Sequence, residues 1–297
     1  MSCHSLYRSP ALEITSCVGD ASRRQPKPMH FSSFEVHFQD DGAYTLHEPG
    51  RALVVDVHHV EVRRAGTTCT YSRPVVSADR GTSIRFSSGI ADALRPRDGD
   101  TPMEFPSGVV RLGPRGFAAM RALRRVIDEC PSNGAMEVER RAIALLGDVV
   151  RAAARRVTVV DNPRRPATSV RHRDAVEHAK AFLAERFHER PTLPAAARLV
   201  DYAPHHLERI FRAHTGLSVH RYLTELRLRQ AAARLDEGAE NLTSLALDLG
   251  FSSQSHFTTA FHGRFGCSPG AYRSRRSFSR DHEDLWLSRV SHRAPPP

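Results

Sequence analysis

Cysteine is scarce in this sequence, and the few cysteines present are poorly placed to share a site. There are five in 297 residues. Because their number is odd, their spacings are wide and no CxxC pair occurs, we expect neither a disulfide framework nor a structural zinc site. The five are Cys3, Cys17, Cys69, Cys130 and Cys267.

Long apolar runs are also missing. The N-terminus lacks the apolar segment that signal peptides carry, and no stretch approaches the roughly 18 apolar residues that a membrane-spanning helix needs. These absences disfavour secretion and membrane insertion. We therefore expect a cytoplasmic protein with no membrane partner.

Signatures of catalysis are absent as well. No Ser/His/Asp constellation, glycine-rich phosphate loop or paired-carboxylate motif occurs, so we predict no enzyme, no catalytic residue and no cofactor. Histidine is plentiful, and His58 and His59 are adjacent. Adjacent strand residues point to opposite faces, and the HxH spacing that would put two ligands on one strand face is absent, so we predict no metal ligand. The other residues considered for that site are His37, His47 and Glu61.

Positive charge is what the sequence does carry. The net charge is +10 and the pI is about 10.0. A basic protein favours polyanionic partners, of which nucleic acid is the commonest. The charge is spread along the chain, so the location of a nucleic-acid site has to come from residue patterns.

The N-terminal half has two kinds of pattern. Short alternating or apolar runs such as 34–38, 43–47 and 51–56 are separated by Gly/Pro turns, which predicts a small β-barrel or sandwich. The stripes at 117–130 and 138–153 have helical spacing. The predicted segments are a flexible leader (1–29), this β-rich half (30–160), a Pro/Arg-rich linker (161–172), a helical half (173–276) and a disordered tail (277–297).

The helical half contains an internal repeat. Segments beginning at Leu193 and Leu242 share one residue pattern, at an offset of 49 residues up to a turn and 50 beyond it. Two copies are too few for a solenoid but suit a duplicated helix-turn-helix. The matched pairs are Leu193/Leu242, Ala197/Ala246, Tyr202/Phe251, Leu207/Phe257, Phe211/Phe261, Gly216/Gly266, Ser218/Ser268 and Tyr222/Tyr272.

Each copy has the residues that a helix-turn-helix needs. Ala197 and Ala246 are small where two helices must cross closely. Gly250 suits the tight turn of the second copy, whereas Asp201 stands at that position in the first. Between the copies, 218–236 predicts one helix of roughly 29 Å, close to the roughly 34 Å between successive major grooves on one DNA face.

The second copy resembles the AraC/XylS family of bacterial regulators. The match covers about 100 of 297 residues. The chain departs from the family pattern at Asp201, Ala203, Thr259 and Gly263, where the family favours glycine, serine or basic residues. The residues that carry the resemblance are Leu245-Ala246, Gly250-Phe251, Ser255, Phe257, Phe261, Gly266, Ser268-Pro269 and Tyr272-Arg273.

The resemblance implies an α+β chain. Its N-terminal part is expected to be a β-rich, cupin-like sensing and dimerisation domain with two helices, and its C-terminal part an all-α double helix-turn-helix. The implied function is an effector-responsive, sequence-specific transcription regulator, an activator in our interpretation. The implied partners are double-stranded DNA, an unknown small-molecule effector, RNA polymerase and a second copy in a homodimer.

Nine residues are the candidates for DNA contact. In the first copy we expect His205 and Arg209 to contact bases and Arg212 to contact phosphate. In the second copy Gln254 can bond bidentately to adenine. The remaining candidates are Ser253, Ser255, Thr258, Thr259 and His262.

Two alternatives from other classes stay open. One is a cupin-type enzyme with a DNA-binding appendage, which stoichiometric metal and turnover would favour. The other is a protein-interaction partner whose DNA unit has decayed, which a lack of any sequence preference would favour.

Overall fold

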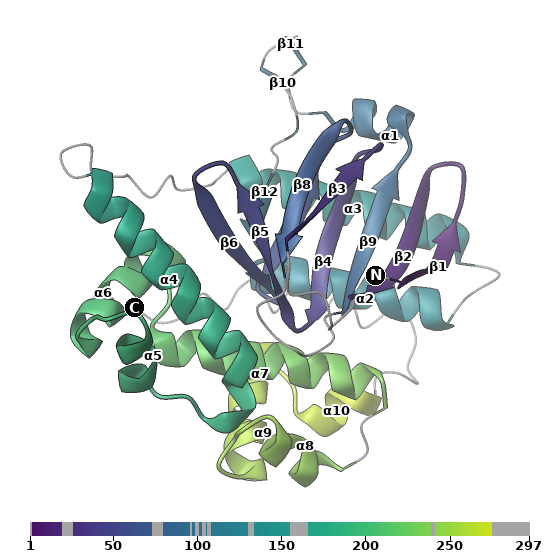
Figure 1. Ribbon diagram of the computed structural model, residues 1–297. Coiled ribbons are helices and arrows are strands. Elements are labelled where there is room, and N and C mark those ends of the chain that lie inside the picture. The colour runs from purple at the N-terminus through teal and green to yellow at the C-terminus, as the bar shows by residue number, and fades with distance from the viewer. Residues whose placement is uncertain are drawn as a thin grey trace.

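The chain folds into a sheet-rich N-terminal half and a helical C-terminal half, as the computed structural model in Figure 1 shows. This arrangement confirms the expected α+β fold class. The structure describes residues 2–19, 26–72, 80–95, 97–98, 101–102, 105, 108–129, 134–154, 166–238 and 241–274.

The described strands of the N-terminal half form two main antiparallel sheets. The larger has the order β1-β2-β9-β4-β7-β12 and the smaller the order β3-β8-β5-β6, while β10 and β11 form a small separate pair. The elements are β1 Ser2–Arg8, β2 Leu12–Val18, β3 Lys27–Phe31, β4 Glu35–Asp41, β5 Ala43–Glu48, β6 Arg51–Asp56, β7 His59–Arg63, β8 Thr67–Ser72, β9 Arg80–Phe86, α1 Ser88–Ala93, β10 Arg97–Asp98, β11 Thr101–Pro102 and β12 Gly108–Arg111.

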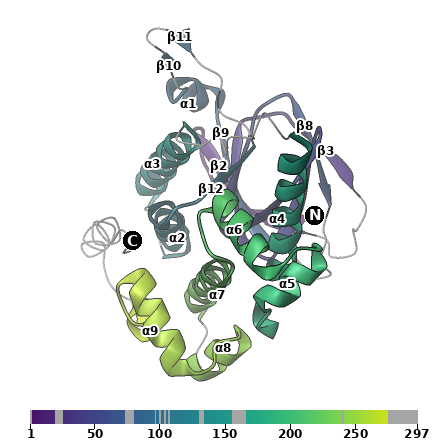
Figure 2. The ribbon, with the colours of Figure 1, turned by 90° about the vertical axis from the view of Figure 1, so that its left-hand side faces the viewer.

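The larger sheet has one apolar face and one polar face, because side chains alternate along each strand. Val36 and Val60 lie on the apolar face and share a core with helices α2 (Pro114–Glu129) and α3 (Ala135–Ala154). Figure 2 shows these two helices side by side. Glu61, next to Val60, points the opposite way toward the smaller sheet. The apolar core therefore lies under the helices, and the space between the sheets is polar.

Glu61 is the centre of this polar space. Its carboxylate accepts hydrogen bonds from the Tyr44 and Tyr71 hydroxyls of the smaller sheet, each at 2.5 Å, and from Arg63 at 2.8 Å. Burial by itself would raise the pKa of Glu61, but the Arg63 charge and these donors lower it. Because the donors come from both sheets, this buried carboxylate joins them.

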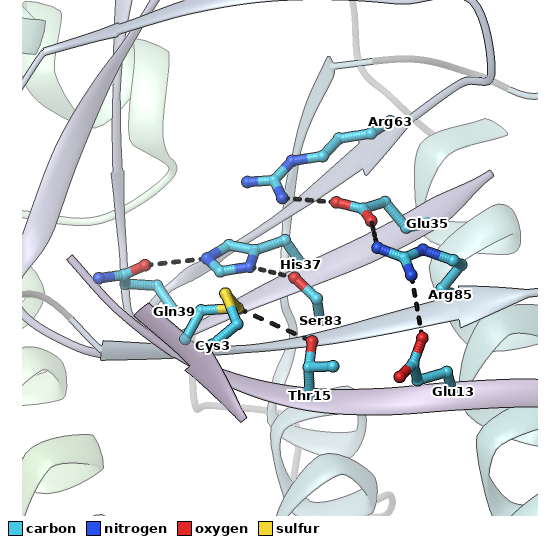
Figure 3. The surroundings of a disulfide bond; sticks show 10 residues. Cys3, Glu13, Thr15, Glu35, His37, Gln39, Arg63, Ser83 and Arg85 are labelled. Atoms are coloured by element: carbon cyan, nitrogen blue, oxygen red, sulfur yellow. Dashed lines mark hydrogen bonds and ion pairs between the residues drawn. A yellow bond between two sulfur atoms is a disulfide. The ribbon is translucent and has the colours of Figure 1, made fainter. Parts of the chain in front are cut away.

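The expected flexible leader over 1–29 is wrong for residues 2–18, which form β1 and β2, and for residues 27–29, which begin β3. Ile14 is fully buried and β2 pairs along its whole length with β9, so its alternating pattern is that of a half-buried strand. Cys3 and Cys17 face each other across β1 and β2 and form a disulfide, which corrects the expectation that none would occur (Figure 3). The wide spacing in sequence is bridged by the hairpin.

The expected linker over 161–172 is corrected in its second part. Helix α4 begins at Pro166 and runs to Arg186, so the helical half starts earlier than residue 173. Proline is well suited to a first helical position, because its missing N–H has no partner there in any case. Residues 161–165 lie outside the described residues, as does the predicted tail over 277–297.

The helical half contains the predicted repeat. Within the residues described, the first copy pairs α5 with α6, the second pairs α8 with α9, and α7 connects them with Ser218 as its N-cap. The expected connecting helix is thereby confirmed. The elements are α4 Pro166–Arg186, η1 Phe187–Glu189, α5 Leu193–Leu199, α6 Pro204–Thr215, α7 Val219–Asp236, α8 Leu242–Asp248, α9 Gln254–Phe265 and α10 Pro269–Ser274.

The turns of the two repeat copies have the same left-handed backbone conformation but different residues in that position. Both need a left-handed conformation, which Asp201 adopts at φ 55° and Gly250 at φ 81°. At Gly250 the surroundings also close in: a Cβ there would lie 2.9 Å from the His188 carbonyl oxygen and 2.8 Å from the Arg227 guanidinium. Glycine is therefore required twice over in the second turn.

Replacing Gly250 by alanine should cost more than the backbone angle alone explains. Gly266, which ends α9 at φ 72°, is the matched control because a Cβ there has nothing within 4 Å. Gly266→Ala should lower the free energy of unfolding by about 1–2 kcal/mol. Gly250→Ala should lower it by about 1–3 kcal/mol more, through the forced contacts. Urea unfolding of the full-length chain measures both, and equal losses would contradict the close approach.

Candidate nucleic-acid interface

The second helix of each repeat copy has one buried face and one exposed face. In α6 the buried face holds Leu207 and Phe211, and in α9 it holds Phe257 and Phe261, all with no exposed surface. These are the i, i+4 pairs that the repeat predicts. Since each helix is anchored by its aromatic face, its opposite face is turned outward and kept in a fixed orientation.

The outward faces carry nearly all the residues predicted to contact DNA. Thr258 is only half-buried, and Ser253 lies just before the first residue of α9. The exposed candidates are His205, Arg209 and Arg212 on α6, and Ser253, Gln254, Ser255, Thr259 and His262 at or on α9. The structure therefore collects the candidates on two outward-facing helices joined by one connecting helix.

The two copies differ at the N-terminus of this second helix. In the second copy the Ser253 hydroxyl accepts a hydrogen bond from the His256 backbone N–H at 3.1 Å, as a capping serine does. In the first copy Ala203 stands at the cap position and makes no side-chain bond, although Pro204 follows it. Ser253 thus has a structural task already, in addition to any contact with DNA.

The first copy has a contact that the sequence did not reveal. His206 of α6 lies 3.4 Å from His172 of α4, measured between their Nε2 atoms, and the His206 ring stacks on Tyr202. Burial, together with the neighbouring His206 and Arg209, lowers the pKa of His172. Three aromatic rings hold α4 against the start of α6. A histidine 34 residues away gives no local signal, so sequence alone does not identify this contact.

Helix α7 is held against the N-terminal half by a buried polar seam, formed by Asp56, Val57, His58, Leu112, Tyr222 and Arg229. In Figure 1 α7 runs below the sheets. The Tyr222 hydroxyl donates to the Asp56 carboxylate, and the His58 ring packs on the Tyr222 ring at 4.3 Å between centroids. Asp56 also accepts from the backbone N–H of His58. One carboxylate thus ties a turn of the N-terminal half to the connecting helix.

Arg229 completes the seam. Its guanidinium donates to the Val57 and Leu112 carbonyl oxygens at 2.8 and 2.7 Å. Burial lowers the pKa of Arg229 to about 9, although Glu225 opposes the shift. Its hydrogen bonds go mainly to backbone carbonyls of the N-terminal half. The buried guanidinium on α7 is therefore satisfied only while α7 is packed against that half.

The far end of α7 is held by a second set of contacts. Asp236 accepts from Arg121 at 2.6 Å and from Arg125 at 2.9 Å, and both arginines belong to α2. Arg125 also lies over the Tyr272 ring of α10, with its guanidinium carbon 4.5 Å from the ring centroid. Helix α2 is therefore placed between the larger sheet and the second repeat copy.

The described part of the chain contains no group of three or more His, Cys, Asp or Glu side chains placed to hold a metal ion. In the same residues, no helix combines the length and the apolarity that crossing a bilayer requires.

Comparison with known proteins points to the same region of the chain. A family model described as a helix-turn-helix domain matches residues 196–275. Residues 196–275 form an AraC-type helix-turn-helix domain. This confirms the resemblance that the repeat indicated, and the matched range begins within α5 and extends through α10.

The relatives of the AraC-type domain are named as regulators. The HTH-type transcriptional regulator GlxA of Rhizobium meliloti is 40% identical over 81 residues, which are 27% of this chain and 25% of GlxA. The HTH-type transcriptional activator RhaS of Escherichia fergusonii is 35% identical over 104 residues, 35% of this chain and 37% of RhaS. The match thus spans only about a quarter to a third of these relatives.

A solved structure covers more of the chain. The crystal structure of unsaturated fatty acid bound ToxT from Vibrio cholerae aligns with 90% of this chain and 96% of its own, at 9% identity and a TM-score of 0.36.

Acidification should weaken the fold through the seam. Burial lowers the pKa of His58 from 6.5 to about 4, so the folded chain holds this ring neutral while the unfolded chain protonates it. The stability it contributes is complete above about pH 6.5 and is lost as the pH falls toward 4, on the order of 3 kcal/mol.

The matched variant for this test is His58→Asn, because an amide can still donate to Asp56 but does not titrate. It should be less stable at pH 7 and should show a flatter pH dependence than wild type between pH 6.5 and 4. Chemical unfolding at several pH values measures the slope. A variant with the wild-type slope would show that His58 is not the responsible group.

Proposed function

We propose that this chain is a sequence-specific DNA-binding transcription regulator. The observation that carries the proposal is that two anchored helices turn polar faces outward from the ends of one connecting helix, and that the face of α6 is also basic. At about 1.5 Å per residue, the 18 residues of α7 extend roughly 27 Å, which suits adjacent major grooves. The regulator names of the AraC-type relatives support the same function.

The N-terminal half is proposed to bind a small effector between its sheets. A polar interior is unusual for a sandwich whose only task is structural, because buried polar groups add little net stability. The Glu61 cluster with its two phenols and an arginine suits a polar ligand. We propose that it is an activator that contacts RNA polymerase and that it forms a homodimer, which would double the DNA contacts. The name of one relative, a transcriptional activator, supports activation alone.

The enzyme alternative has no supporting observation among the described residues. Their side chains form no candidate metal centre, and the named relatives are regulators rather than enzymes. From the regulator names of these relatives, we propose that the chain acts in the cytoplasm and does not catalyse a reaction.

The proposed function is tested by comparing how DNA binding changes when each of two arginines of α6 is replaced by alanine. Selection of bound genomic fragments by the purified chain provides the site. Arg209→Ala should then cost about 1–3 kcal/mol on that site and relax the preference at one base pair. Arg212→Ala should weaken all sequences about equally and reduce the salt slope by about one unit.

Arg51→Ala is the control for total charge, because Arg51 lies on β6 in the N-terminal half and is exposed. It should leave both binding and salt slope unchanged. Titrations with the selected DNA and its single-base variants at several salt concentrations separate the cases. If wild type selects no preferred sequence, the proposal of sequence-specific regulation is wrong. If Arg209→Ala loses the same affinity on every sequence, only the assignment of Arg209 to base reading is wrong.

A further inference from the structure

Gln254 is held by a side chain of the preceding helix. The Thr243 hydroxyl, in the first turn of α8, donates a hydrogen bond of 2.5 Å to the Gln254 side-chain oxygen at the start of α9. Thr243 itself is fixed, because its backbone N–H donates to the Asn241 cap at 2.9 Å. The bond therefore runs from a capped helix start to the first residue of the candidate recognition helix.

In this bond the side-chain oxygen of Gln254 faces Thr243, which sets the orientation of the amide group. The carbonyl oxygen has two lone pairs, and Thr243 takes only one of them. The second lone pair and both amide hydrogens remain available, and adenine offers an N6 hydrogen and the N7 acceptor to a glutamine. An amide fixed in this way is ready to read adenine before DNA arrives.

The fold does not require this bond. At the equivalent positions of the first repeat copy stand Pro194 and Pro204, neither of which has a hydroxyl or amide side chain. Nevertheless α5 and α6 have the same lengths as α8 and α9, seven and twelve residues, and Gly216 and Gly266 end the second helices at the same φ of 72°. The lengths of these helices and the way the second helix ends therefore do not depend on this contact.

We propose that Thr243 is a positioning residue for base recognition, which holds the Gln254 amide in the orientation that reads one adenine. This inference rests on the proposed function. A long, exposed glutamine loses rotamer freedom when it binds, and ordering it in advance lowers that cost. Thr243 then contributes to specificity without touching the base.

The test compares Thr243→Val, which keeps the shape but lacks the hydroxyl, with Thr243→Ser, which keeps the hydroxyl. In the full-length chain Thr243→Val should lower discrimination at one base pair about three- to tenfold. Its melting temperature and its affinity for unrelated DNA should stay unchanged. Thr243→Ser should restore discrimination at that base pair.

A double variant distinguishes positioning from direct contact. Gln254→Ala should abolish the preference at the same base pair, and Thr243→Val combined with Gln254→Ala should be no worse than Gln254→Ala alone, since the hydroxyl acts only through the glutamine. Losses that add, and that fall equally on all sequences, would mean that Thr243 contacts DNA itself and would overturn the proposal. Unchanged discrimination in Thr243→Val would also overturn it.

A measurement without DNA keeps this inference separate from the proposed function. The side-chain amide of Gln254 gives its own NMR signals, and its order should drop in Thr243→Val and recover in Thr243→Ser. Equal mobility in wild type and Thr243→Val would refute the positioning role. If the amide is ordered by Thr243 but wild type prefers no DNA sequence, the proposed function fails and the specificity role fails with it.

Discussion

The architecture depends on the burial of one cation on the connecting helix. A guanidinium removed from water is costly unless its hydrogen bonds are replaced. For Arg229 the replacements are the Val57 and Leu112 carbonyl oxygens, and both belong to the N-terminal half. Because α7 also joins the two repeat copies, the bonds that satisfy this side chain, together with those of Tyr222 and Asp236, place both copies relative to the sheets.

Local patterns made the helical half predictable. Small residues at the helix crossings, aromatic i, i+4 pairs and a turn glycine depend on neighbours within a few residues, and their recurrence identified two copies. The alternation that identified β4 and β5 has the same local origin. The strands over residues 2–18 were not predicted, because a polar composition concealed the alternation of β2 and because its partner, β9, lies far along the chain.

Contacts between residues far apart in the sequence could not be predicted, because they leave no pattern among neighbouring residues. Tyr222 and Asp56 are 166 residues apart, and neither residue carries a local sign that it will be buried beside the other. A serine at 252 or 253 could be expected to cap the helix that follows, and the structure shows Ser253 in that place. Thr243 and Gln254 could not be paired, because the separation of 11 residues matters only once a turn brings α8 and α9 together.

The seam also limits how such chains can exchange parts. A DNA-binding half from a relative, grafted onto this N-terminal half by recombination, would have to supply a phenol, a guanidinium and a carboxylate at the places of Tyr222, Arg229 and Asp236. Any graft lacking them would remove the Tyr222 hydrogen bond from the buried Asp56 and the carboxylate that Arg121 and Arg125 share. The two halves therefore need matched residues at the seam, whereas the exposed faces of α6 and α9 can change without disturbing it.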